Sequence, residues 1–403
     1  MKLLTVVGAR PNFMKAAPII AAIQNHNSKV ERGEVGPTIQ HILVHTGQHY
    51  DAVMSGSFFA DLNLRDPDIE LGIGSGSHAV QTAEILRKFE TVLLTERPDA
   101  VVVVGDVNST MACALATAKI TFDASRTRPL LAHVESGLRS FDRLMPEEVN
   151  RVVTDHIADL LLVTEDRAVE NLQAEGISHE KIHFVGNTMI DSLLKYREKA
   201  ETSDVLERLG VVRSASYALL TLHRPSNVDS RDTFVNIIEG LEELARECSI
   251  VFPVHPRTRK QIAEFGLEHR FRSQAQEDHN AAALILTEPL GYLDFVCLMK
   301  NAALVVTDSG GIQEETTCLG VPCVTIRENT ERPVTVSIGT NVIAGTTKAG
   351  IQAAVRRQLR MGSGRKSAMP RKWDGHAGDR VVEVLIQSVE RRFAPQVVSS
   401  VDL

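Results

Sequence analysis

The feature of this sequence that most constrains its fold is an uninterrupted apolar run at residues 100–104, where one alanine precedes four valines. A strand without a polar position is buried on both faces, which is typical of a parallel sheet covered by helices. Asp106 follows the run after one glycine, and an alanine-rich segment that can form a helix comes next. Because parallel strands need crossover connections, we expect strands and helices to alternate along the chain.

Ten further short and mostly apolar runs alternate with helical segments. Five lie in the first half of the chain, at residues 2–7, 41–44, 129–132, 160–163 and 182–185. Five follow, at residues 217–222, 249–254, 284–287, 302–306 and 322–326. We therefore predict an α/β fold of two Rossmann-like domains, residues 1–186 and 187–378, that face each other across a cleft. A C-terminal helix within residues 379–403 is expected to pack back on the first domain.

Composition and spacing argue against several classes of protein. A net charge of −7 over 403 residues disfavours a nucleic-acid binder with a broad basic surface. No apolar run approaches the roughly 18 residues of a membrane span, and the N-terminus does not resemble a signal peptide, so we expect a cytoplasmic protein. The five cysteines form no CxxC pair, and His45 and His49 lack the acidic partner of an HExxH helix. No metal site is therefore expected.

The segment at residues 133–151 brings many charged side chains to the end of a predicted strand, before a helix that begins at Pro146. It contains Glu135, Arg139, Asp142, Arg143 and Glu147. Asp106 follows the neighbouring strand, and the carboxyl ends of parallel strands share one edge. Carboxylates at such an edge suit proton transfer. The alternatives are a solvated loop with ion pairs and, for Asp106, a helix N-cap.

Two junctions between a strand and a helix have the composition of phosphate sites. The glycine turn at residues 8–11, which contains Arg10, precedes a helix that includes Lys15, and free amides at a helix start favour anions. The Ser-Gly-Gly sequence at residues 309–311 also opens a helix, in which Glu315 could accept two ribose hydroxyls. No GxGxxG with a later acid is present, so a nucleoside diphosphate conjugate fits better than NAD. The alternatives are a plain turn with surface cations and a surface position for Glu315.

Together these motifs make the chain resemble the non-hydrolysing UDP-N-acetylglucosamine 2-epimerases. The resemblance covers nearly the whole chain, in order, and depends on motifs at residues 8–11, 46–49, 105–106, 133–139, 146–151, 186–188, 223–224, 253–256, 307–315 and 330–333. It implies a glycosyltransferase-B-like fold, a homodimer, and no metal or NAD cofactor. It also implies reversible conversion of UDP-GlcNAc to UDP-ManNAc, by elimination of UDP to 2-acetamidoglucal and re-addition, for bacterial or archaeal surface polysaccharides.

The resemblance also implies roles for individual residues. Asp106, Glu135 and Glu147 match the catalytic carboxylates, and His223 matches a group that assists the UDP leaving group. The expected substrate-binding residues are Arg10 and Lys15 for phosphate, Ser309, Gly310, Gly311 and Glu315 for diphosphate and ribose, and Phe295 for uracil.

Two departures from the family pattern affect these expectations. Better-known members have an arginine where this chain has Val80, and that arginine belongs to a second UDP-GlcNAc pocket that activates the enzyme. Gln48, Glu148 and His255 match other parts of this allosteric pocket. The loop between Arg139 and Pro146 is also about two residues shorter than in those members, which affects the placement of Glu147.

Three other functions are consistent with the same sequence. A hydrolysing 2-epimerase would release ManNAc and UDP from the same fold. A 2-epimerase of a modified UDP-sugar, such as a diacetamido uronic acid, would use extra arginines. A glycosyltransferase of the same fold would share the predicted nucleotide site, but it has less reason to place three acids at the strand ends of the first domain.

Overall fold

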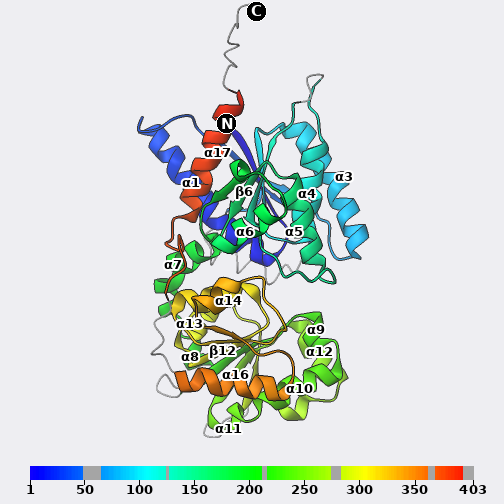
Figure 1. The fold of residues 1–403 in the computed structure, drawn as a ribbon, viewed down its shortest axis with the longest axis vertical. Helices are drawn as coiled ribbons and strands as arrows, with labels where there is room; N and C mark the ends of the chain where they lie inside the picture. Colours follow the sequence, from blue (N-terminus) through cyan, green and yellow to red (C-terminus); the bar gives the residue numbers. More distant parts are fainter. Residues whose placement is uncertain (49–64, 124–126, 211–215, 274–282, 362–367, 394–403) are drawn as a thin grey trace, which may run out of the picture. The chain divides into compact units, whose positions relative to one another are not determined.

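The computed structural model describes residues 1–48, 65–123, 127–210, 216–273, 283–361 and 368–393. These residues form two compact units, each built on a parallel sheet of seven described strands (Figure 1). The described part of the first unit is residues 1–48, 65–123, 127–191 and 374–393, and the described part of the second unit lies within residues 192–373. The sequence placed these boundaries at residues 186 and 378.

The first sheet has the strand order of a doubly wound Rossmann fold. In spatial order its strands are β3 (Ile69–Glu70), β2 (Gln40–His45), β1 (Lys2–Val7), β4 (Ala100–Val104), β5 (Leu130–Ser136), β6 (Leu160–Val163) and β7 (Ile182–Phe184). The helices are α1 (Arg10–Glu31), α3 (His78–Glu96), α4 (Asn108–Lys119), α5 (Pro146–Ile157), α6 (Asp166–Ala174) and α17 (Ala377–Phe393), and α7 (Thr188–Glu201) leads into the second unit.

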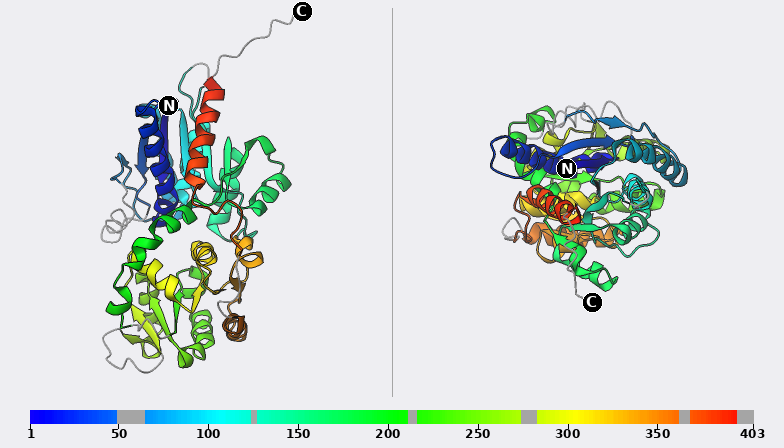
Figure 2. Two further views of the ribbon diagram at one scale, coloured as in Figure 1. Left: turned by 90° about the vertical axis from the view of Figure 1, so that its left-hand side faces the viewer. Right: turned by 90° about the horizontal axis from the view of Figure 1, so that it is seen from above.

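The central strand β4 is buried on both faces, as its composition predicts. Successive side chains of a strand point to opposite faces. Val101 and Val103 accordingly join a core with α3 and α4, whereas Val102 and Val104 join a core with α1 and α17. Helix α17 lies beside α1 although their sequences are far apart (Figures 1 and 2). The C-terminal helix thus completes the layer on one face of the first sheet.

The second unit repeats this architecture. Its strands, in spatial order, are β10 (Arg272–Ser273), β11 (Leu284–Thr287), β9 (Ser249–Pro253), β8 (Tyr217–Thr221), β12 (Leu304–Thr307), β13 (Cys323–Thr325) and β14 (Asn341–Ile343). Its helices are α8 (Val205–Arg208), α9 (Pro225–Val228), α10 (Arg231–Leu241), α11 (Leu244–Glu247), α12 (Pro256–Glu264), α13 (Tyr292–Asn301), α14 (Gly310–Leu319), α15 (Pro333–Ser337) and α16 (Lys348–Met361). Two parallel sheets with alternating helices confirm the predicted α/β class.

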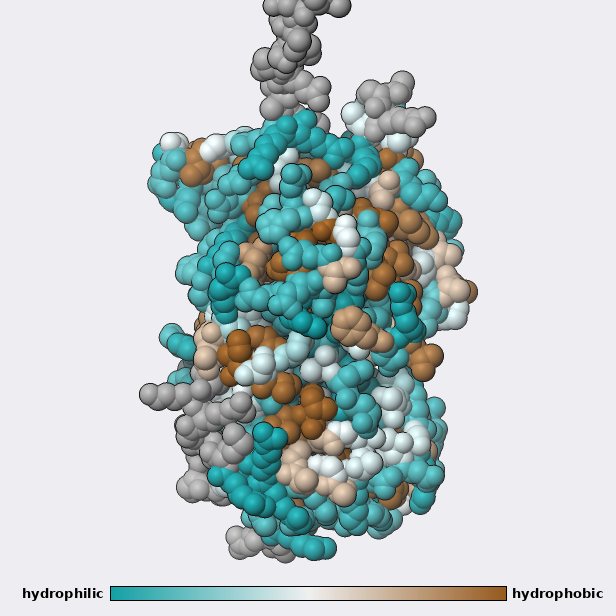
Figure 3. Space-filling view, viewed as in Figure 1, coloured by the Kyte–Doolittle hydropathy of each residue, from teal (hydrophilic) through white to brown (hydrophobic). Residues whose placement is uncertain are grey.

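Most of the surface seen in Figure 3 is hydrophilic, as expected for helices that bury one apolar stripe and turn their polar sides to water. None of the helices in the described residues has the length and apolar composition that crossing a membrane would require. The polar groups that distinguish this chain lie instead at the carboxyl ends of the strands.

Candidate active site

The turn after β1 is held by one asparagine. Asn12 Oδ1 accepts hydrogen bonds from the amides of Gly8 (3.1 Å) and Ala9 (3.0 Å), and its Nδ2 donates to the Val104 carbonyl (2.9 Å). This joins the ends of β1 and β4. Arg10 is the first residue of α1, and its side chain lies outside the part of the structure that can be described.

Glu135 interrupts strand β5 and forms an ion pair with Lys15. It has a φ of 71°, in the left-handed region that side-chain-bearing residues rarely adopt, and the pairing register between β5 and β6 shifts at this point. A bulge of this kind re-aims a side chain near a functional site. Both partners of the ion pair are buried. The structure therefore brings together two predicted site residues that are 120 positions apart.

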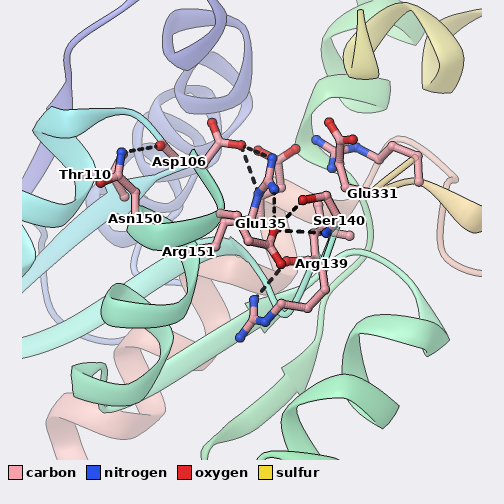
Figure 4. Close-up of polar contacts among 12 residues, drawn as sticks. Asp106, Thr110, Glu135, Arg139, Ser140, Asn150, Arg151 and Glu331 are labelled. Carbon is pink, nitrogen blue, oxygen red and sulfur yellow. Dashed lines mark hydrogen bonds and ion pairs between the residues drawn. The ribbon is translucent and has the colours of Figure 1, made fainter. Parts of the chain in front are cut away.

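Asp106 lies at the neighbouring strand end and is bound by Arg151 from α5. The Arg151 guanidinium donates to Asp106 Oδ2 from Nη2 (2.6 Å) and Nε (3.0 Å), and to Glu148 Oε2 from Nη1 (2.8 Å) (Figure 4). Asn150 also donates to the Asp106 carbonyl (2.9 Å). Helix α4 begins after Val107, which is its N-cap, so the alternative role of Asp106 as N-cap is wrong.

Two consecutive acids at the start of α5 have different surroundings. Glu148 is buried and accepts hydrogen bonds from the amides of Ser140 and Phe141, both at 2.9 Å. Burial opposes ionisation of Glu148, but these amides and the Arg151 guanidinium outweigh it and lower its pKa. Glu147 is half-buried and, within the described residues, forms neither a hydrogen bond nor an ion pair. Glu147 is thus the acid of this pair that is available to a ligand.

The residues predicted to form a second pocket belong to both units. Gln48 is buried and its Oε1 accepts hydrogen bonds from the amide (3.0 Å) and hydroxyl (2.7 Å) of Ser109. Val80 is exposed on α3. Glu148 is already bound by the amides of Ser140 and Phe141 and by Arg151. His255 belongs to the second unit, where it is the exposed N-cap of α12.

In the second unit, His223 and Asp308 join the ends of β8 and β12. His223 Nδ1 lies 2.9 Å from Asp308 Oδ1, and the amides of His223 (3.0 Å) and Arg224 (2.9 Å) donate to Asp308 Oδ2. Burial opposes ionisation of Asp308, but His223 and these amides outweigh it and lower the pKa of Asp308. The carboxylate fixes the orientation of the His223 ring, which is half-exposed.

Helix α14 begins as the sequence predicts and contains a buried acid. Ser309 is its N-cap, Gly310 and Gly311 are its first residues, and Glu315 lies one turn further on. Glu315 is 6% exposed, so the alternative of a surface position is wrong. Burial raises its pKa to about 8, although the Tyr292 hydroxyl donates to it at 3.2 Å. Phe295 lies half-buried on α13, one turn after Tyr292.

Three arginines near the start of α14 were not among the predicted site residues. Arg327 donates to Glu331 at 2.6 Å and Arg224 at 3.3 Å, while Arg332 forms an ion pair with Glu314 at 2.8 Å. A Cβ at Gly310 would meet Glu331 Oε1 at 2.8 Å, so a larger residue at this first helical position would have to displace the buried Glu331 carboxylate. The free amides at the start of α14 suit a diphosphate, and the three arginines beside them are paired with Glu331 and Glu314.

Comparison with known proteins identifies the family. A family model for UDP-N-acetylglucosamine 2-epimerase matches residues 33–386. A UDP-N-acetylglucosamine 2-epimerase of Methanocaldococcus jannaschii is 42% identical over 389 residues, which are 96% of this chain and 99% of that protein. This chain belongs to the UDP-N-acetylglucosamine 2-epimerase family. A UDP-2,3-diacetamido-2,3-dideoxy-D-glucuronate 2-epimerase of Pseudomonas aeruginosa is 38% identical over 362 residues, 89% of this chain and 92% of that protein.

Solved structures of the UDP-N-acetylglucosamine 2-epimerase family support the fold. The M. jannaschii enzyme in complex with UDP-GlcNAc and UDP has a TM-score of 0.83 and 41% identity, over 96% of this chain and all of that one. The predicted family and its glycosyltransferase-B-like fold class are confirmed. Among the described residues, no group of three or more His, Cys, Asp or Glu is placed to hold a metal ion.

Proposed function

We propose that this protein interconverts UDP-GlcNAc and UDP-ManNAc by inverting the sugar at C2. The observation that supports this most directly is the pair of carboxylates, Asp106 and Glu135, on adjoining strand ends of a chain that belongs to the 2-epimerase family. Each is held by a cation, Arg151 and Lys15 respectively. The two cations fix the positions of the carboxylates, and a positioned carboxylate can accept and donate a proton.

The chemistry proceeds through elimination because C2 has no adjacent carbonyl to acidify its proton. A base removes the C2 proton, the C2–H electron pair forms the C1–C2 double bond, and UDP departs with the electrons of the C1–O bond. UDP then adds back to C1 while a proton reaches C2 from the other face. Removing a proton from one face of C2 and returning it to the other requires more than one acid–base group. We propose that Asp106, Glu135 and Glu147 transfer these protons.

The second unit supplies the proposed UDP site. Free amides at Gly310 and Gly311 and the hydroxyl of Ser309 suit the diphosphate. Glu315 accepts the ribose hydroxyls, and Phe295 packs against uracil. His223, oriented by Asp308, assists UDP as it leaves. From the first unit, Arg10 and Lys15 provide positive charge for the phosphates.

A second candidate substrate is a UDP-diacetamido uronic acid. The 38% identity to the P. aeruginosa 2-epimerase of such a sugar favours it. So do Arg224 and Arg327, although both are partly neutralised by Glu331. The two substrates differ at C3 and C6, so direct competition between them will identify the preferred one.

The first experiment is proton NMR of the purified protein with UDP-GlcNAc in D2O. Formation of UDP-ManNAc, with deuterium at C2 of both UDP-GlcNAc and UDP-ManNAc, would establish reversible epimerisation through C2–H cleavage. Free ManNAc and UDP would instead assign the chain to the hydrolysing enzymes. If nothing happens to UDP-GlcNAc but the diacetamido uronate turns over, the substrate is the modified sugar. Transfer of the sugar to an acceptor would indicate a glycosyltransferase.

Glu135→Gln tests the central acid with little change in shape. We expect turnover to fall by at least 10²-fold, in line with the usual contribution of a positioned acid or base. UDP binding, measured by calorimetry, should remain within about threefold of the unmodified protein. Unchanged turnover would remove Glu135 from the mechanism.

We also propose a cytoplasmic homodimer that supplies surface polysaccharide synthesis and takes no nucleic-acid partner. Light scattering of the purified protein tests the dimer. The exposed Val80 gives the second pocket no cation at that position, so we expect weak or no activation by added UDP-GlcNAc. A sigmoidal dependence of rate on UDP-GlcNAc concentration would contradict this.

A further inference from the structure

One buried group in the first unit has no part in the mechanism above, although it lies next to the proposed acids. His133 is fully buried on β5, two residues before Glu135. Its Nδ1 lies 2.6 Å from Asp155 Oδ1, and its Nε2 lies 2.7 Å from the Gly105 carbonyl oxygen. Both ring nitrogens therefore have close partners inside the protein.

The identity of these partners determines how many protons the ring carries. A carbonyl oxygen can only accept a hydrogen bond, so Nε2 must donate to Gly105. The second oxygen of Asp155 accepts from the Gly137 amide (3.0 Å) and from Arg139 Nη1 (2.7 Å). Burial opposes ionisation of Asp155, but the buried guanidinium of Arg139 at its second oxygen lowers the pKa of Asp155 and favours the charged carboxylate. An ionised carboxylate also only accepts, so Nδ1 must donate as well.

The His133–Asp155 pair holds two backbone positions that flank the proposed acids. Gly105 immediately precedes Asp106, and Gly137 follows Glu135 by two residues. Gly105 and Glu135 both have a φ of 71°. Such a backbone conformation at Glu135 is unfavourable by itself and persists only where the surroundings enforce it.

The backbone at Gly105 also lies close to the side chains of Lys15 and Glu135. A Cβ on Gly105 would lie 3.2 Å from Lys15 Nζ and 3.4 Å from Glu135 Oε2. A small movement of the Gly105 carbonyl would therefore alter the surroundings of Glu135 and shift Asp106, the next residue. The bonds of the His133 ring and of Asp155 therefore act on the backbone beside both acids, in addition to the ion pairs that Arg151 and Lys15 make with the acids themselves.

We propose that His133 is a doubly protonated imidazolium which, with Asp155, acts as a positioning pair that fixes Asp106 relative to Glu135 for proton transfer at C2. The proposal rests on the roles proposed above for these two acids. It differs from a purely stabilising ion pair because it predicts a change in the course of the reaction. Loss of the pair should misalign one acid with the sugar while the UDP site in the second unit stays intact.

The matched variants are Asp155→Asn and Asp159→Asn. Asp159 accepts hydrogen bonds from the Leu131 amide (2.9 Å) and from Arg128 (2.7 Å) at the opposite end of β5, so it is a carboxylate that binds the same strand far from the acids. In D2O we measure the rate of epimer formation and the rate of deuterium entry into the starting sugar. Asp155→Asn should lower kcat about 10²-fold with little change in KM, because misplacement by roughly 1 Å has that effect.

The ratio of deuterium exchange to epimer formation separates positioning from stability. Asp155→Asn should change this ratio, because exchange needs one acid and epimerisation needs both. Asp159→Asn should lower the melting temperature and leave the ratio unchanged. An unchanged ratio and kcat in Asp155→Asn would overturn the proposal. If Asp155→Asn does not fold, His133→Gln is measured in the same way, and an unchanged ratio and kcat there overturn it equally.

A second measurement needs no substrate. NMR of the unmodified protein labelled with 15N-histidine should show a proton on both ring nitrogens of His133 at neutral pH. One protonated nitrogen would refute the imidazolium whatever the activity. If the unmodified protein shows both protons yet epimerises no UDP-sugar, the proposed function fails and the imidazolium remains.

Discussion

Replacing Glu315 with glutamine should stabilise the free protein and weaken UDP binding. Glu315 is buried on α14, close to Glu314, and the hydroxyl of Tyr292 donates to it at 3.2 Å. Burial, followed by the charge of Glu314, raises its pKa to about 8. The free protein therefore carries a carboxyl group that is costly to ionise, at the position proposed to accept the ribose hydroxyls.

The magnitude and sign follow from the difference between the folded and unfolded states. Relative to the ordinary value of 4.5, a folded-state pKa of about 8 corresponds to roughly 5 kcal/mol at about 1.4 kcal/mol per pKa unit. Between these values the folded protein binds more protons than the unfolded chain, so stability falls as pH rises from about 4.5 to about 8. Glutamine cannot ionise, and the Glu315→Gln variant should lose this part of the pH dependence.

The assay is urea unfolding of both proteins from pH 4.5 to 8.5, followed by fluorescence of the single tryptophan, Trp373. The stability advantage of Glu315→Gln should grow steadily across this range, up to about 5 kcal/mol. Calorimetry at pH 8 should show UDP bound at least about tenfold more weakly, because hydrogen bonds to a charged acceptor contribute roughly 1.5–3 kcal/mol. A stability difference that does not change with pH would refute the reasoning.

Three further substitutions test other parts of the structure. Asp191→Asn removes a carboxyl group whose pKa is raised to about 6 by burial. The stability of the variant relative to the unmodified protein should therefore be greater at pH 7 than at pH 4, by up to roughly 3 kcal/mol. UDP binding should not change. Glu148→Gln should cost about 3 kcal/mol at pH 7, and this loss should shrink below about pH 4.5, because the lowered pKa of Glu148 stabilises the fold only while it is ionised. Gly137→Ala should lower the unfolding free energy by about 2–4 kcal/mol in urea, because its φ is 79° and the new Cβ would lie 2.6 Å from the Ala168 carbonyl oxygen. A loss below about 0.5 kcal/mol for Gly137→Ala would contradict that geometry.

The alternation of strands and helices could be predicted because a strand buried on both faces must be apolar at every position. Val101 and Val103 face one core and Val102 and Val104 the other, so neither face tolerates a polar residue. The short edge strands β3 and β10 have two residues each, which is too few to show any periodicity. Their position follows from hydrogen bonds to a neighbouring strand, and a single sequence does not contain that information.

The position of Asp106 and Glu135 at strand ends indicated them as candidates, and the sequence also named Lys15 and Glu148, but nothing in it indicated Arg151 or Asp155. Glu148, Arg151 and Asp155 stand at positions i, i+3 and i+7 of α5, so they share one helix face. All three are buried. A charged stripe on a helix normally indicates a face turned to water. The contacts of Arg151 with Asp106 and of Asp155 with His133 show that this face of α5 is buried against the sheet.

The buried face of α5 explains why this helix is built from polar residues. Its buried positions are Glu148, Asn150, Arg151, Thr154 and Asp155, with no leucine, isoleucine or valine among them. Replacing buried ion pairs by well-packed apolar residues is often neutral or stabilising, so stability alone does not require this composition. An apolar α5 could cover the sheet, but it could not bind the Asp106 carboxylate or the His133 ring. The polar composition of α5 is therefore better explained by the placement of the acids at the strand ends than by the stability of the first unit.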